Sequence, residues 1–156
     1  MAGKNILLID CYQTTEFGKS LLESPHGYDV DWVDSIPAAV LELEKKKGRK
    51  AVVIEPIMSI PSEDWLKTEG KKLSEKYLGF SEVLFSRENY RVCGLYLAPI
   101  IRELEPSAKI IAYSLWGNLE MKITQVGKRT RDLLSHLKIP HVSKPNIDEL
   151  VKQIES

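Results

Sequence analysis

Three short, almost uninterrupted apolar runs most strongly limit what this chain can fold into. They cover Asn5 to Asp10 (NILLID), Lys50 to Glu55 (KAVVIE) and Lys109 to Ser114 (KIIAYS). A strand has this composition when both faces of its sheet are covered, as in parallel sheets. The runs therefore predict central strands of a parallel sheet with helices on both faces.

Two weaker segments complete the expected sheet. Tyr28 to Val33 alternates apolar with acidic residues, which is typical of an edge strand, and Pro140 to Ser143 is a further short apolar run. A helix is expected after Ser35, with Pro37 in its first turn. Other helical patterns lie near Phe17 to Leu22, Val92 to Leu104, Lys128 to His136 and Asp148 to Ile154. Alternating strands and helices predict an α/β fold of five parallel strands with right-handed crossovers.

One stretch, Ser59 to Glu88, is too long for an ordinary loop between a strand and its helix. We expect a helical insertion after the third strand, at the carboxyl edge of the sheet. Because the interrupted βα unit closes without it, we expect the insertion to be separable from the core and to serve recognition. Its aromatic residues are predicted to anchor it: Trp65, Tyr77, Phe80 and Phe85.

Composition limits the function classes. The 156 residues suit a single domain, expected over 1–156. Lys plus Arg and Asp plus Glu number 22 each, so net charge gives no support for binding nucleic acid or a membrane surface. The Lys45 to Lys50 cluster is predicted to be a solvated helix end.

The cellular location is predicted from absent signals. No apolar run approaches the roughly 20 residues of a membrane-spanning helix, and the N-terminus has no signal-peptide pattern. The two cysteines, Cys11 and Cys93, share no metal-ligand spacing and are expected to be reduced thiols. We therefore expect a cytoplasmic protein.

Four polar residues end the predicted strands. They are Asp10, Glu55, Ser114 and, just after the last run, Lys144. In parallel α/β sheets, ligand binding and chemistry gather at the carboxyl ends of the strands. We therefore expect these four side chains at one edge of the sheet.

In their order and strand placement, these residues resemble the receiver domain of two-component response regulators. KPNIDELVKQI, from Lys144, resembles that family's Lys-Pro and short amphipathic helix. GLYLAPIIRELEPSAKIIAYS, from Gly94, resembles its Gly-Leu helix, strand and hydroxyl residue, and EPIM, from Glu55, keeps a methionine three residues after the acceptor position. The resemblance covers most of the chain outside the insertion and implies a flavodoxin-like fold.

The resemblance also implies roles for single residues. It puts Glu55 at the phospho-acceptor position and Asp10 and Cys11 in the acidic pocket. The positions of the switch residues and of the conserved Lys-Pro are taken by Ser114, His141, Lys144 and Pro145.

Departures from the family pattern change the expected chemistry. Cys11 stands where the family has a second carboxylate, and its soft sulfur is a poor Mg²⁺ ligand, so the magnesium site at Asp10 and Glu55 is expected to be degenerate. Glu55 exceeds an aspartate by one methylene, roughly 1.5 Å, more than in-line phosphoryl transfer tolerates. Two interpretations of Glu55 stay open: a built-in mimic of the phosphorylated state, facing Ser114 and Lys144, or a carboxylate that merely pairs with Lys144.

The resulting functional prediction is a stand-alone, atypical receiver-like signalling module that is not an enzyme and needs no cofactor. It would act by binding another protein, a histidine kinase or an output protein, and a homodimer is compatible with this role. No GxSxG, HExxH or GxGxxG motif indicates an enzyme class.

The alternative is a flavodoxin-like small-molecule-binding domain or enzyme that uses the crevice at the strand ends, since one fold hosts both functions. A deep apolar pocket beside Asp10, Glu55 and Lys144 would favour this alternative. A shallow site plugged by Glu55 and Lys144 would favour signalling.

Overall fold

The computed structural model describes residues 4–11, 15–58, 62–80, 90–114 and 124–156. In these ranges five parallel strands form one sheet with the order β2-β1-β3-β4-β5. The strands are β1 (Asn5–Ile9), β2 (Asp29–Val33), β3 (Ala51–Ile54), β4 (Lys109–Ser114) and β5 (His141–Ser143). Each predicted strand is confirmed, and β2 lies at an edge of the sheet, as its alternating sequence predicts.

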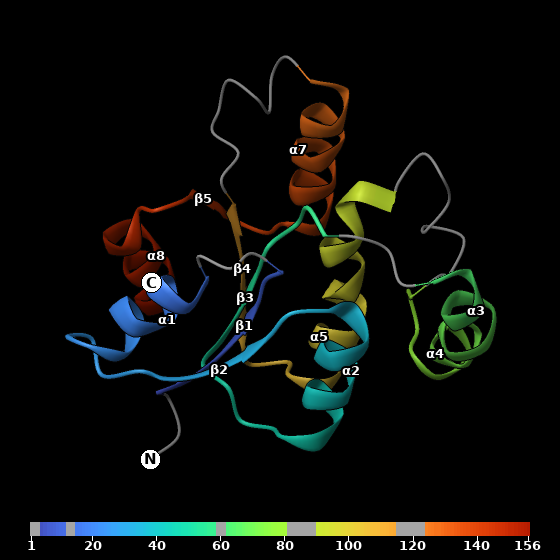
Figure 1. Cartoon of the computed structure of the whole chain (residues 1–156), viewed down its shortest axis with the longest axis horizontal. Helices are drawn as coiled ribbons and strands as arrows, with labels where there is room; N and C mark the ends of the chain where they lie inside the picture. The colour runs from blue at the N-terminus through green and yellow to red at the C-terminus, as the bar shows by residue number, and fades with distance from the viewer. Residues whose placement is uncertain (1–3, 12–14, 59–61, 81–89, 115–123) are drawn as a thin grey trace.

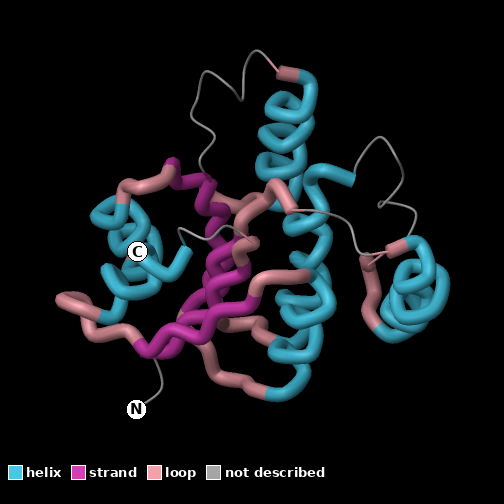
Figure 2. The backbone as a smooth tube through the Cα atoms, viewed as in Figure 1, coloured by secondary structure: helices cyan, strands magenta, loops and turns pink. Residues whose placement is uncertain are grey.

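Helices cover both faces of this sheet. They are α1 (Thr15–Glu23), α2 (Ile36–Lys45), α5 (Ala98–Leu104), α7 (Gln125–Leu137), α8 (Ile147–Glu155) and a 3₁₀ helix, η3 (Tyr90–Leu97). In Figures 1 and 2, α1 and α8 lie together on one side of the strands, while α2 and α5 lie on the other. The α7 helix packs along η3. The flavodoxin-like α/β fold is thus confirmed.

The side chains of each central strand alternate between two buried clusters. In β1, Leu7 and Ile9 belong to the cluster under α2 and α5, whereas Ile6 and Leu8 belong to the cluster under α1 and α8. All four are at most 2% exposed. Because both faces are buried, the sequence of β1 shows an unbroken apolar run rather than an alternating one.

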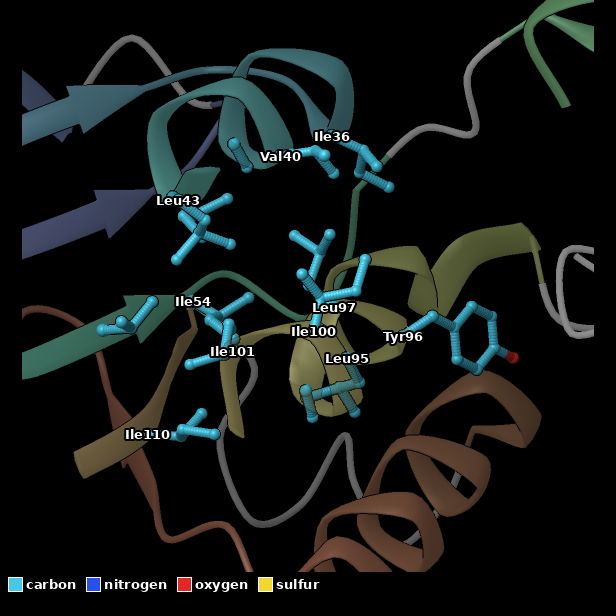
Figure 3. Close-up of a cluster of buried hydrophobic side chains, with 14 of the residues drawn as sticks. Ile36, Val40, Leu43, Ile54, Leu95, Tyr96, Leu97, Ile100, Ile101 and Ile110 are labelled. Atoms are coloured by element: carbon cyan, nitrogen blue, oxygen red, sulfur yellow. The ribbon is translucent and has the colours of Figure 1, made fainter. Parts of the chain in front are cut away.

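The larger cluster lies between the sheet, α2 and the helices that follow the insertion. The Ser35 hydroxyl caps α2 by accepting a hydrogen bond from the Ala38 N–H at 3.2 Å, which starts the helix before its buried residues. Figure 3 shows Ile36, Val40 and Leu43 of α2 across from Leu97, Ile100 and Ile101. This packing fixes η3 and α5 against the carboxyl end of β3.

The described part of the insertion is helical, as predicted. It comprises α3 (Glu63–Trp65), a π-helical turn, η1 (Leu66–Gly70), and α4 (Lys71–Lys76). Ser62 caps its start by accepting a hydrogen bond from the Trp65 N–H at 3.1 Å.

The described part of the insertion packs into the core, so its separability from the core stays a prediction that a deletion must test. Leu73, Tyr77 and Phe80 are at most 7% exposed and belong to the cluster under α2 and α5. The Tyr77 hydroxyl also donates to the Glu44 carboxylate of α2 at 2.8 Å. The anchoring prediction is therefore confirmed for Tyr77 and Phe80. Trp65 packs partly buried against the same cluster, and Phe85 lies outside the described residues.

The expectation that the Lys45 to Lys50 cluster is a solvated helix end was wrong for Arg49. Arg49 is 3% exposed, and its guanidinium contacts the carboxylates of Glu42 and Glu105 at 3.1 and 3.4 Å. Glu105 Oε2 in turn accepts hydrogen bonds from the backbone N–H groups of Gly48 and Arg49, both at 3.2 Å. Arg49 thus joins the connections that lead into β3 and β4.

No helix of the described chain is long and apolar enough to span a bilayer.

Candidate functional site at the carboxyl ends of the strands

Parallel strands bring the four predicted site residues to one edge of the sheet. Asp10 directly follows β1, Glu55 follows β3, Ser114 ends β4 and Lys144 follows β5. Backbone hydrogen bonds continue the sheet through them: the Glu55 N–H donates to the Ile9 carbonyl at 2.8 Å, and the Lys144 N–H donates to the Ser114 carbonyl at 2.7 Å. The sheet therefore fixes where each side chain begins.

A single ammonium group bridges two buried carboxylates. Lys144 Nζ donates to Asp10 Oδ2 and to Glu55 Oε2, the latter at 3.1 Å. Asp10 and Glu55 are each 1% exposed, and the Lys144 side chain is 8% exposed. The second oxygen of Glu55, Oε1, accepts a hydrogen bond from the Ile57 N–H at 3.0 Å. We call Asp10, Glu55 and Lys144 the ion triad.

The ion triad carries an excess of negative charge when all three groups are ionised. Burial, the largest cause, and repulsion by Asp10 raise the pKa of the Glu55 carboxyl to about 7. The Lys144 ammonium and the Ile57 N–H oppose this rise because both stabilise the ionised form. Near neutral pH, Glu55 therefore exchanges between the ionised and the protonated form.

Two aromatic residues border the ion triad, and the sequence analysis missed both. The Tyr113 ring centroid lies 5.6 Å from Lys144 Nζ, a cation–π distance. Burial and the Asp10 charge raise the pKa of Tyr113 to about 12. Trp32 donates from Nε1 to the Asp10 carbonyl at 2.8 Å. Their signal in the sequence is positional: Tyr113 precedes Ser114 in β4, and Trp32 lies near the end of β2, beside β1.

Cys11 lies beside the ion triad and is a free, exposed cysteine. Partial burial of the sulfur and the charges of Asp10 and Glu55 raise the pKa of the Cys11 thiol. The thiol therefore stays protonated at neutral pH, and a neutral thiol is a poor metal ligand and nucleophile.

The remaining predicted positions lie in and after β5. His141 opens β5, paired with Ala112, and its buried Nε2 has no hydrogen-bond partner among the described residues. Burial lowers the pKa of His141, which favours the neutral imidazole. Pro145 follows Lys144 through a cis peptide bond. His141 is thus not part of the ion triad, whereas Pro145 is joined to it.

Close packing supports the backbone at Glu55. A Cβ atom added to Gly94, in η3, would lie 2.2 Å from the Glu55 carbonyl oxygen. Only glycine permits this approach, which brings η3 directly against the end of β3.

The donor set does not fit the Mg²⁺ ion that the receiver resemblance implies. Magnesium needs hard oxygen ligands in near-octahedral geometry, but the carboxylates of Asp10 and Glu55 already bind Lys144 Nζ. Among the described residues, no group of three or more His, Cys, Asp and Glu side chains could hold a metal ion.

Two cavities lined by described residues lie away from the ion triad. One, of about 400 Å³, adjoins Arg49 and Glu105 at the opposite end of the strands. The other, of about 300 Å³, lies between α2 and the insertion. Neither is lined by Asp10, Glu55 or Lys144.

Comparison with solved structures identifies the fold as that of response-regulator receiver domains. A response regulator receiver protein from Pseudomonas putida matches with a TM-score of 0.62 and 17% identity, over 99% of this chain and 98% of that one. A CheY-like receiver domain protein from Methanospirillum hungatei JF-1 matches with a TM-score of 0.62 and 15% identity, over 97% and 90%. A response regulator from Burkholderia pseudomallei matches with a TM-score of 0.62 and 14% identity, over 97% and 66%. No protein-family model matches the sequence, and no curated protein is significantly similar to it.

Proposed function

We propose that this chain is an atypical receiver-like signalling module that acts by binding another protein and in which the ion triad has replaced phosphorylation. The receiver-like fold supports a signalling role. The observation that carries the proposal is the contact of Lys144 Nζ with both Asp10 and Glu55.

The ion triad disfavours phosphoryl transfer to Glu55. An acceptor carboxylate must present a free oxygen in line with the incoming phosphorus, and the developing charge must be neutralised. Here Glu55 Oε2 binds Lys144 and Oε1 binds the Ile57 N–H, and the residue is 1% exposed. The longer side chain and the neutral thiol of Cys11 act in the same direction.

Under both interpretations of Glu55, its carboxylate contacts Lys144. The distance of 3.1 Å between Glu55 Oε2 and Lys144 Nζ agrees with either one. The conformation at this edge is then set when the chain folds, not by a kinase. Under this proposal, the signal is the binding of a partner protein and not a change in the phosphorylation of this chain. The proposal assigns the chain no catalytic step and no cofactor, and its partner is a protein.

The test restores the two residues that depart from the receiver pattern. The wild type and the double variant Glu55→Asp, Cys11→Asp are incubated with acetyl phosphate and Mg²⁺, and intact mass is measured. We expect no change in the wild type and gain of one phosphoryl group in the double variant. The single variants are the matched controls, because each restores only the acceptor length or only the second carboxylate.

The outcomes separate the two functional candidates. A wild type that becomes phosphorylated at Glu55 would overturn the proposal. A folded double variant that stays unmodified would mean that the site has diverged further from a receiver, which would favour the small-molecule-binding alternative.

A further inference from the structure

A groove of about 300 Å³ runs between α2 and the insertion, away from the ion triad. Two helical stripes line it: Pro37, Val40, Leu41 and Glu44 on α2, and Trp65, Glu69 and Leu73 on the insertion. The α2 residues lie three, four and seven positions after Pro37, and the insertion residues lie four and eight positions after Trp65, so each stripe follows one face of its helix.

Exposure varies along the lining of the groove. Leu73 is buried, and Glu44 accepts hydrogen bonds from the Tyr77 hydroxyl and from Lys76. The Leu41 residue is 69% exposed and the Glu69 side chain is 54% exposed. An apolar side chain from outside can therefore enter beside Leu41.

The lining has a definite chemistry. Five of its side chains are apolar, two are carboxylates and none is cationic. Glu69 has an exposed ion pair at 3.2 Å with Lys72, one helical turn away, and such pairs are weak and exchange readily. Glu44, in contrast, is already paired with Lys76. The groove thus fits an apolar group that carries a positive charge on the side of Glu69.

The insertion helix is also irregular where it borders the groove. Its π turn, Leu66–Gly70, has the Lys71 N–H donating to the Leu66 carbonyl. Single π turns are often found at functional positions of helices. This one lies between Trp65 and Leu73, in the segment that the sequence analysis singled out for recognition.

We propose that this groove binds a basic amphipathic segment of a partner protein. One apolar side chain of the segment enters between Leu41 and Trp65, and a Lys or Arg of the segment meets Glu69 in place of Lys72. Glu44 keeps its contacts with Lys76 and Tyr77. This is helix-in-groove recognition, in which an apolar anchor gives affinity and the flanking charges give orientation. The inference does not depend on the chemistry of the ion triad.

The test uses a panel of synthetic helical peptides with a central Leu or Phe flanked by Arg one turn away on each side. Two-dimensional NMR of isotope-labelled protein should show shifts confined to residues 37–44 and 65–73. Replacing Arg by Glu, or the central residue by Ser, should weaken binding by about tenfold or more.

Matched surface variants locate the binding site. Leu41→Asp and Glu69→Lys should each weaken binding by about tenfold. Leu78→Asp and Glu63→Lys are the controls, because both residues are exposed and neither lines the groove. Circular dichroism checks that every variant is folded.

Several outcomes would overturn the inference. They are failure of every basic peptide to bind at millimolar concentration, equal binding of the Glu-flanked peptides, and unchanged binding to Leu41→Asp and Glu69→Lys. Self-association of the protein that Leu41→Asp abolishes would also overturn it, because a second copy would then be the occupant.

Discussion

At the scale of single residues, Lys144 holds two buried negative charges in place. Removing one partner of a buried ion pair costs about 3–5 kcal/mol, because the remaining charge is left uncompensated. We therefore expect Lys144→Met to lower the free energy of unfolding by about that amount at alkaline pH, measured by urea denaturation. Lys152→Met is the matched control, since Lys152 is exposed in α8. A loss similar to that of the control would mean that Lys144 does not stabilise the site.

Glu55 should make the stability of the fold depend on pH. Its pKa is raised from 4.5 to about 7 in the folded protein, so between these values the folded state binds more protons than the unfolded state. The stabilising contribution of Glu55 is therefore full below about pH 4.5 and is lost as pH rises through about 7.

Glu55→Gln removes this titration while keeping the size of the side chain. Urea denaturation across this pH window should show the wild type losing stability relative to Glu55→Gln as pH rises. At the alkaline end the variant should be the more stable of the two, because it no longer buries a second anion beside Asp10. Parallel pH profiles for the two proteins would contradict the raised pKa.

At the scale of elements, the insertion contributes to the core through a few side chains. Tyr77 is 3% exposed, whereas its neighbour Leu78 is 93% exposed. Truncating a buried aromatic residue costs about 3–5 kcal/mol, while surface changes stay within about 0.5 kcal/mol. We expect Tyr77→Ala, measured by urea denaturation, to destabilise the protein by about this larger amount and Leu78→Ala to have almost no effect. Equal, small losses would support the prediction that the insertion is separable from the core.

The elements differ in how well their sequences predict them. The run Ala51–Ile54 has both faces buried, so its apolar composition alone identifies it as a central strand. The segment from Tyr90 to Leu104 has helical spacing, but it divides into 3₁₀ and α-helical parts. Gly94 approaches the Glu55 carbonyl there, and Pro99 lies in the first turn of α5. Such a division depends on packing against β3, which helical periodicity does not encode.

At the scale of the whole molecule, prediction succeeded where the strand topology decides which residues meet and failed for a side-chain contact that the topology does not specify. The parallel sheet brings Asp10, Glu55 and Lys144 to one edge, because parallel strands end on the same side. The burial of Arg49 depends on Glu105, which lies 56 residues away in sequence. The charges near Arg49 in the sequence do not indicate that contact, so Arg49 was predicted to be exposed to solvent like the lysines around it.

The stability of the whole molecule also tests whether its ion triad has replaced a metal site. A cation that binds only the folded state at about 100 times its Kd would add about 2.7 kcal/mol. For a domain of this size, each kcal/mol raises Tm by about 2–4 °C. We expect the Tm of the wild type to change by less than about 1 °C between EDTA and about 10 mM MgCl₂ at matched ionic strength. The physical reason is that Lys144 occupies the carboxylates of Asp10 and Glu55, and the Cys11 thiol offers no hard oxygen.

The Glu55→Asp, Cys11→Asp variant is the control, since it restores a set of carboxylates and should gain Tm with added Mg²⁺. A saturating rise of several degrees in the wild type at submillimolar Mg²⁺ would show that the metal displaces Lys144, and the replacement of the metal site by the ion triad would then be wrong.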